Sequence, residues 1–181
     1  MRLFLALVPP AAIRRALLNT MHALPGARWQ TDAQLHVTLR FVGDVDRHAA
    51  DALMLALRRE RFARIEARLD GFGFFDRRDR VDQLWAGLSP RDPLERLHAR
   101  LDRLCVGIGL EPEGRKYVPH ITLARFARTM APSAEQLAQW LSAQPLLPGD
   151  TFAFDRLVLM ESHMGRDGSV YEPVFEVGMT D

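Results

Sequence analysis

Two short stretches of this chain carry the same pattern, His-x-Thr-Leu, with a β-branched residue in the second position. One is His36-Val37-Thr38-Leu39, and the other, 84 positions later, is His120-Ile121-Thr122-Leu123. Successive side chains of a β-strand point to opposite faces, so His and Thr share one face and the apolar pair shares the other. Each copy is therefore predicted to be a strand with an apolar core face and a polar face that lines a cleft.

The elements expected around these motifs repeat as well. Each half of the chain reads as strand, helix, His strand, helix and strand, and one further strand closes the second half. The predicted strands are 2–8, 34–42, 64–70, 81–88, 117–126, 151–162 and 170–177, with a hairpin turn at 165–168, and the predicted helices are 10–24, 46–59, 92–108 and 133–141.

This order predicts an α+β fold of two duplicated lobes with antiparallel sheets. We expect a pseudo-two-fold axis to relate the lobes around a central groove, with the helices outside. No linker separates the halves, so residues 1–181 are expected to form one domain, with lobes at about 1–75 and 76–181 and room for the terminal strands to exchange.

The composition narrows the function classes. A net charge of +1 gives no global basic field for nucleic acid, and no apolar run is long enough to cross a membrane. A single cysteine, Cys105, excludes an internal disulfide and suits the cytoplasm. No cluster of His, Cys, Asp or Glu has metal-ligand spacing, and no glycine-rich nucleotide loop is present, so neither a metal nor a cofactor is expected.

The repeated His and Thr indicate chemistry. Packing alone gives no reason to keep both polar residues on one face in both copies, so we expect His36 and His120 to be catalytic. One imidazole can accept a proton from a nucleophile while the other donates a proton to the leaving oxygen, and no metal is needed. Thr38 and Thr122 are predicted to hold the oxygens of a phosphodiester. The residues themselves leave open which histidine is the acid.

The chain resembles the two-histidine (2H) phosphoesterase superfamily, and within it the RNA 2′,3′-cyclic phosphodiesterase or 2′-5′ RNA ligase (LigT-like) family. The matching pieces run from one end of the chain to the other: 1–7, Arg28-Trp29, 35–43, 115–119, 120–125, and the closing hairpin from Ser162 to Tyr171. The resemblance implies the bilobal fold and hydrolysis of RNA 2′,3′-cyclic phosphate ends to 2′-phosphomonoesters. It also implies a weak, ATP-independent reverse joining of ends such as tRNA halves through a 2′-5′ bond. On this analogy His36 is the proton donor and His120 the proton acceptor, in a protein expected to be monomeric.

Further residues are candidates for contacts with the substrate. Arg125 matches a phosphate-binding position of the family, but strict alternation from His120 puts it on the opposite face unless a bulge near Ala124 turns it inward. Arg40 is in phase with His36 and is the better phosphate ligand on alternation alone. Three aromatic residues could stack a terminal base, namely Phe41, Tyr117 and Tyr171.

Two alternatives stay open. One is an enzyme of the same chemistry that acts on another small cyclic phosphodiester. The other is an RNA-end binding module without turnover, although binding alone needs arginine or lysine more than paired imidazoles.

Overall fold

The computed structural model describes residues 1–165 and 168–181. Its strands are β1 (Arg2–Leu7), β2 (Ala27–Trp29), β3 (Val37–Asp44), β4 (Phe62–Ala63), β5 (Ile65–Asp76), β6 (Val81–Ser89), β7 (His120–Phe126), β8 (Phe152–Phe154), β9 (Arg156–Gly165) and β10 (Gly168–Thr180). Its helices are α1 (Ala11–Leu18), α2 (Arg47–Arg59), α3 (Asp92–Gly107) and α4 (Ala134–Ser142), with a 3-10 turn, η1 (Asp32–Gln34).

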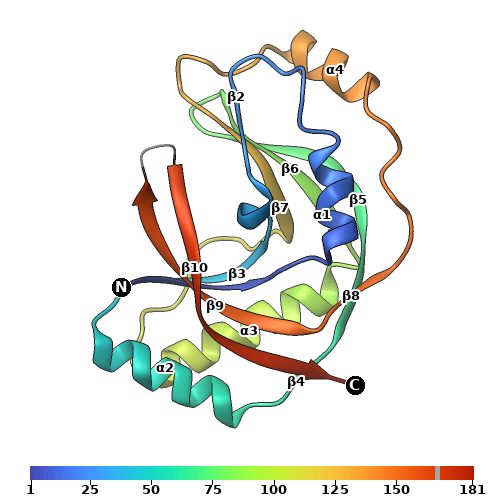
Figure 1. Ribbon diagram of the computed structural model, residues 1–181. Helices are drawn as coiled ribbons and strands as arrows, with labels where there is room; N and C mark the ends of the chain where they lie inside the picture. Colours follow the sequence, from blue (N-terminus) through green and yellow to red (C-terminus); the bar gives the residue numbers. More distant parts are fainter. Residues whose placement is uncertain (166–167) are drawn as a thin grey trace.

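The strands follow one continuous order, β4-β10-β9-β1-β3-β7-β6-β5-β8, with β2 also paired to β7. Neighbours are antiparallel except for β10 and β4, which run parallel. At the middle of this order β3 and β7 meet through one residue pair, Val37 and Ile121. Helices α2 and α3 lie together beneath the part that holds β1, β9 and β10, whereas α1 and α4 lie towards β5 and β6 (Figure 1).

Strand β1 shows how the core is divided. Leu3, Leu5 and Leu7 belong to the main hydrophobic core. The alternate residues Phe4 and Ala6 point to the other face and form a second, small cluster together with Val158 and Met160 of β9. Both faces of β1 are therefore packed against apolar side chains, which explains its almost wholly apolar sequence.

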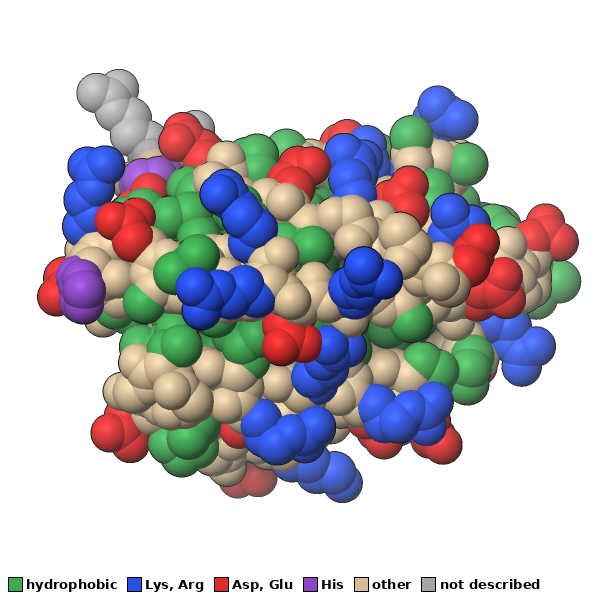
Figure 2. Space-filling view, turned by 90° about the horizontal axis from the view of Figure 1, so that it is seen from below, with side chains coloured by type: hydrophobic (Ala, Val, Ile, Leu, Met, Phe, Trp, Pro, Cys, Tyr) green, Lys and Arg blue, Asp and Glu red, His purple; other side chains and the backbone are tan. Residues whose placement is uncertain are grey.

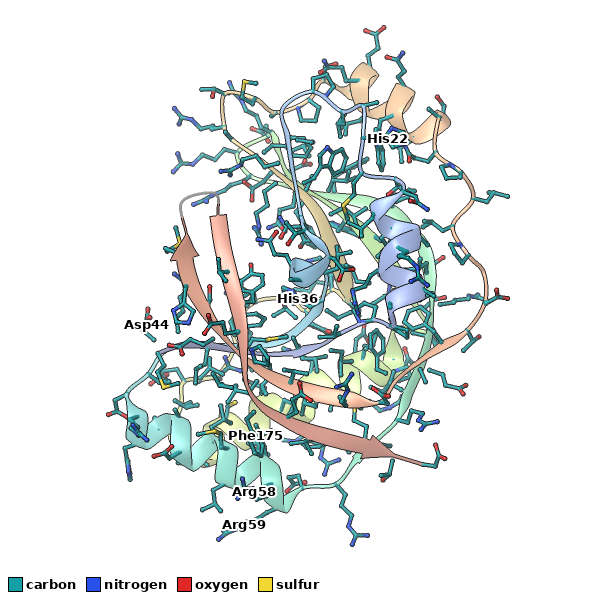
Figure 3. All side chains as sticks on the ribbon, in the orientation of Figure 1. His22, His36, Asp44, Arg58, Arg59 and Phe175 are labelled. Atoms are coloured by element: carbon teal, nitrogen blue, oxygen red, sulfur yellow. The ribbon has the colours of Figure 1, made fainter. Side chains whose placement is uncertain are left out.

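The helices beneath the sheet follow from amphipathic sequences. The Asp46 carboxylate caps α2 by accepting a hydrogen bond from the backbone N–H of Ala49 at 2.8 Å. At the other end of α2, the Arg58 guanidinium lies 5.4 Å from the ring centre of Phe175 on β10 (Figure 3). Apolar residues at helical spacing face the core from both helices: Ala50, Leu53 and Leu57 of α2, and Leu94, Leu97, Leu101 and Cys105 of α3.

The predicted α+β class is confirmed, with local differences. The strand expected at 64–70 continues to Asp76, and the strand expected at 151–162 is interrupted at Asp155. The first helix ends at Leu18, and η1 and β4 were not predicted. Residues 166–167 of the predicted hairpin turn lie outside the described residues.

The two-lobe division with a pseudo-two-fold axis stays a prediction. Strands β9 and β10, from the end of the chain, extend the sheet from β1, whereas β5 pairs with β6. Within residues 1–165 and 168–181, no helix combines the length and apolar character needed to cross a membrane.

Candidate active site

The two motif histidines come from neighbouring strands. Val37 and Ile121, the residues that join β3 to β7, each directly follow a histidine and are fully buried. Side chains alternate along a strand, so His36 and His120 point away from the core on the opposite face. Continuing the Val37–Ile121 register would set His36 beside Thr122 and Thr38 beside His120. Figure 3 shows His36 near the centre of the molecule, where β3 begins.

Both imidazoles are held in the same tautomer. His36 Nδ1 lies 2.8 Å from the carbonyl oxygen of Gln34, and His120 Nδ1 lies 2.7 Å from that of Val118. A carbonyl oxygen only accepts hydrogen bonds, so Nδ1 carries the proton in each ring and Nε2 of the neutral ring is the basic nitrogen. His36 Nε2 accepts from the Thr38 hydroxyl at 3.0 Å. The two rings therefore share the same basic nitrogen, Nε2.

Two aromatic rings enclose His36. The ring of Phe4 lies 5.0 Å from the imidazole centre, and the ring of Tyr171 lies 5.1 Å from it at 85°. Phe4 and Tyr171 also pack edge-on against each other. Tyr171 comes from β10, which the Gln34 side chain fixes by donating to the carbonyl oxygen of Ser169 at 2.6 Å. The C-terminal hairpin thus builds one wall around His36.

His120 has a matching enclosure from other elements. The ring of Phe75 lies 4.8 Å from its imidazole centre at 88°, and the Trp85 indole lies 5.9 Å away. Trp85 fits because residue 73 is glycine: a Cβ there would lie 2.2 Å from Cη2 of the indole. Each catalytic candidate is therefore packed against two aromatic rings and is only partly exposed.

This burial shifts the acid–base properties of both rings. Burial lowers the pKa of His36 to about 4, and the charges of His120 and Arg125 act in the same direction against the carbonyl of Gln34. Burial and the Arg125 charge likewise lower the pKa of His120, against the carbonyl of Val118. Both imidazoles are neutral at pH 7. A bound anion would raise both pKa values and let one ring take up the proton that an acid needs.

A β-bulge decides the direction of Arg125. On β6, Trp85 pairs with Thr122 and Leu84 pairs with Ala124, so Leu123 is an extra residue on β7. Leu123 and Ala124 are both buried, and the alternation restarts one position later. Arg125 therefore shares a face with His120 and Thr122, as the bulge expected near Ala124 requires.

The first motif strand has a bulge at the equivalent place. This bulge changes the direction predicted for Arg40. On β1, Ala6 pairs with Thr38 and Leu5 pairs with Arg40, so Leu39 is the extra residue. Cross-strand partners share a face, and Leu5 belongs to the main core. Arg40 therefore points to the helix-covered side, away from the Thr38 hydroxyl.

Arg40 is also fully occupied there. Its side chain is 4% exposed, and its Nε lies 2.6 Å from Oδ1 of Asp102 on α3. It donates to the carbonyl oxygens of Phe41 and Glu111, and the Glu113 carboxylate lies 3.7 Å away. The prediction that Arg40 binds substrate phosphate is wrong, because the bulge turns it into an ion-pair network that fastens β3 to α3.

Comparison with known proteins agrees with this geometry. The sequence matches the profile of the 2′-5′ RNA ligase superfamily over residues 9–166. The chain belongs to this superfamily. An RNA 2′,3′-cyclic phosphodiesterase of Aeropyrum pernix is 30% identical over 167 residues, which cover 91% of this chain and 94% of the relative. Another protein of that name, from Methanocaldococcus jannaschii, is 25% identical over 97% of this chain and 99% of its own.

Solved structures show that the similarity extends to the whole fold. The structure of E. coli LigT complexed with 3′-AMP has a TM-score of 0.79 at 27% identity, and the match covers 99% of this chain and 98% of that one. TT0787 of Thermus thermophilus has a TM-score of 0.78 at 25% identity with the same coverage. The α+β fold of these solved structures thus matches nearly the entire chain.

The aromatic candidates fall in two places. Tyr171 lies against His36, and Phe41 is 46% exposed on the same face as Phe4, its partner on β1. Tyr117 instead stacks on His98 of α3, with ring centres 4.2 Å apart at 5°. Its hydroxyl is buried without a hydrogen-bond partner among the described residues, and burial raises its pKa. Tyr117 is therefore a packing residue of this superfamily member, and the prediction that it stacks a base is wrong.

Sequence reasoning missed Gln83. Its side-chain oxygen accepts from the Thr122 hydroxyl at 3.2 Å, and its backbone pairs with Arg125. The signal was present in the alternation of β6: Leu84, Ala86 and Leu88 are buried, so Gln83 and Trp85 face the motif side. Phe4 and Phe75 were also missed, because nothing in the sequence shows which aromatic residues reach a distant histidine. Across residues 1–165 and 168–181, no three His, Cys, Asp or Glu side chains gather as a metal-ligand set.

Proposed function

We propose that this chain is an RNA 2′,3′-cyclic phosphodiesterase. The observation that carries the proposal is the arrangement of two imidazoles on adjacent strands, both with a protonated Nδ1 and a basic Nε2. This is the requirement for simultaneous proton donation and proton abstraction at one phosphorus centre. The relatives named RNA 2′,3′-cyclic phosphodiesterase support the choice of substrate.

In the proposed reaction His120 Nε2 takes a proton from water as the water oxygen attacks phosphorus. The bond from phosphorus to O3′ breaks, and His36, protonated on Nε2, gives its proton to O3′. The product is a 2′-phosphomonoester. Before the next cycle His120 loses its proton to solvent and His36 takes one up. With a 5′-hydroxyl in place of water as the nucleophile, the same attack on the cyclic phosphate would break the bond from phosphorus to O3′. The two ends would then be joined through a 2′-5′ bond without ATP, and the two histidines would exchange roles when that bond is cleaved again.

Three further side chains would hold the non-bridging oxygens. Arg125 supplies a positive charge near both imidazoles, and the hydroxyls of Thr38 and Thr122 would supply neutral donors once they exchange their present acceptors, His36 and Gln83, for phosphate. The Thr38 hydroxyl donates to His36 while that ring is neutral. Protonation of Nε2 would turn this contact around, so the hydroxyl hydrogen becomes free for phosphate at the stage when the acid is loaded.

The proposed substrates are RNA ends with a 2′,3′-cyclic phosphate, tRNA halves among them, and the proposed working form is a monomer. The single cysteine, Cys105, is buried in the core. A buried free thiol suits the reducing cytoplasm, where we place the activity.

The test is hydrolysis of a short oligoribonucleotide that ends in a 2′,3′-cyclic phosphate. His36→Ala and His120→Ala should each lower kcat by about 10²–10⁴-fold. His48→Ala, an exposed histidine on α2, is the matched control and should retain wild-type turnover. Activity should survive EDTA. Near-full activity in either motif variant would overturn the proposal, and so would a loss in EDTA that added metal restores.

Two outcomes would favour the alternatives. Turnover of another small cyclic phosphodiester, with none on the oligonucleotide, would indicate a different substrate for the same chemistry. Tight binding of the oligonucleotide without turnover would indicate an RNA-end binding module.

A further inference from the structure

Two arginines face each other beside the candidate site. Arg28 on β2 pairs directly with Arg125 on β7. Cβ atoms of directly opposed residues lie about 5 Å apart, and like charges in such a pair destabilise the sheet. No carboxylate within residues 1–165 or 168–181 lies at ion-pairing distance from either guanidinium. The pair thus has two positive charges and no acidic partner in the described part of the chain.

Some arginines elsewhere do have acidic partners. On the face seen from below the sheet, blue and red side chains are interspersed (Figure 2). Arg100 pairs with Glu60, and Arg64 lies 3.7 Å from Asp181. Other arginines also lack an acidic partner, so what sets Arg28 and Arg125 apart is their direct opposition across the sheet beside the candidate site, a position that suits an anionic ligand.

Arg28 lies on the same face as the motif side chains. Its neighbour Trp29 pairs with the buried Ala124 and packs against Trp140 of α4, with ring centres 6.2 Å apart. Trp29 therefore points to the core, and Arg28 points to the other face with Arg125. The backbone N–H of Gln30 donates to the carbonyl oxygen of Leu123 at 2.8 Å, which fixes β2 against the bulge.

The two arginines differ in their distance from the chemistry. The Arg125 charge lowers the pKa of both His36 and His120. Arg28 is exposed and is not among the charges that shift either histidine. Arg125 is therefore the inner member of the pair, and Arg28 lies one step further out on the same face.

We propose that Arg28 forms a second phosphate subsite, which binds the internucleotide phosphate on the 5′ side of the terminal cyclic phosphate. This inference rests on the proposed function. An RNA end carries such a phosphate, one nucleoside away from the reacting centre, whereas a 2′,3′-cyclic mononucleotide does not. Adjacent guanidinium groups on one face can bind two successive phosphates of a single strand, and each can do so through two N–H donors. The subsite would make the enzyme prefer polymers over cyclic mononucleotides.

The test compares Arg28→Gln with wild type on two substrates: a tetraribonucleotide ending in a 2′,3′-cyclic phosphate, and 2′,3′-cyclic AMP. Loss of a charged phosphate contact should lower the ratio of kcat/KM between tetranucleotide and mononucleotide about ten-fold. A tetranucleotide with a neutral methylphosphonate at the last internucleotide position should show the same loss with wild type and no additional loss with Arg28→Gln. Arg59→Gln, an exposed arginine at the remote end of α2, is the matched control (Figure 3).

The slope of log KM against log salt for the tetranucleotide should also fall by about 0.7 in Arg28→Gln, the value of one counterion contact on a single strand. A ratio of kcat/KM between tetranucleotide and mononucleotide that is the same in Arg28→Gln as in wild type would overturn the subsite. If wild type turns over neither substrate, the proposed function fails. The subsite can then still be tested by fluorescence anisotropy, which measures the binding of a labelled tetranucleotide ending in a 3′-phosphate. Equal binding by wild type and Arg28→Gln would then overturn the subsite, and about ten-fold weaker binding by the variant would support it.

Discussion

Leu39 and Leu123 occupy equivalent places in the two motif strands: each is the extra residue of a β-bulge directly after His-x-Thr. Each bulge reverses which of the following side chains point to the motif face. In β3 the bulge sends Arg40 to the core side and Phe41 to the motif face, and in β7 it sends Ala124 to the core and Arg125 to the motif face. The same local device therefore supplies an aromatic ring in one half and a positive charge in the other.

A change of leaving group can show which of the two histidines is the acid and which is the base. A substrate in which sulfur replaces the bridging O3′ has a leaving group that needs no proton. If His36 is the acid, His36→Ala should lose about 10²–10⁴-fold on the oxygen substrate and regain most of that loss on the sulfur substrate. His120→Ala should stay slow on both, as measured by thiol release. Rescue of His120→Ala alone would reverse the assignment.

The lowered pKa of His36 predicts a pH-dependent stability. The folded protein binds this proton only near pH 4, whereas the unfolded chain binds it near the ordinary value of 6.5. Between these values the unfolded state binds more protons, so the free energy of unfolding falls as the pH falls from about 6.5 to 4. His36→Asn removes this contribution, of at most about 3 kcal/mol. Urea unfolding of both proteins at pH 7 and pH 4.5 should show the smaller difference for the variant, and equal differences would contradict the prediction.

The charge of Arg125 should be visible at both histidines. Because this charge lowers the pKa of His36 and of His120, Arg125→Gln should raise both. Arg125→Lys keeps the charge and loses the planar fork, so it should leave the two pKa values close to wild type while it weakens phosphate binding. NMR titration of the imidazole Cε1–H signals measures the first effect, and titration with inorganic phosphate measures the second. Unmoved pKa values in Arg125→Gln would show that the guanidinium lies away from the pair.

Arg40 should matter for stability and leave the chemistry of folded molecules intact. Arg40→Met breaks a buried ion pair and leaves Asp102 without its charged partner, at a cost of about 3–5 kcal/mol. Replacing both residues, as in Arg40→Met with Asp102→Leu, should recover part of this loss, since no uncompensated charge remains. Denaturant unfolding gives the stabilities, and active-site titration gives the turnover per folded molecule. A stable but inactive Arg40→Met protein would restore a direct role in catalysis.

The Arg40 network also adds an acid-sensitive contribution. Burial acts to raise the pKa of Asp102, but the backbone N–H of Glu113 and the Arg40 guanidinium outweigh it and hold that pKa below its usual value. This stabilisation is present above the ordinary carboxyl range and is lost as the pH falls through the folded-state value. In Arg40→Met the acid limb of the stability curve should therefore be flatter than in wild type.

Much of the fold and half of the site follow from alternation alone. The repeated His-x-Thr pattern predicted both strands and the shared face of His36 and Thr38, since a regular strand obeys a period of two. Arg40 was predicted wrongly because a bulge breaks that period, and the sequence of β3 has no glycine or proline at Leu39 to indicate it. Tyr117 was misplaced because its position depends on contact with His98, a residue of another element. Gln83 could have been found from the alternation of its own strand, whereas Phe75 depends on the strand order.

Among residues 1–165 and 168–181, the two motif strands pair through one pair of residues, Val37 and Ile121. The offset between the two imidazoles is therefore a property of strand register. A slip of one residue would shift one histidine by about 3.3 Å along its strand and exchange its two faces. Substitutions at Val37 or Ile121 can therefore alter the spacing of the two imidazoles without touching either histidine. The Val37–Ile121 pair thus sets the distance between the two histidines, although neither Val37 nor Ile121 takes part in the chemistry.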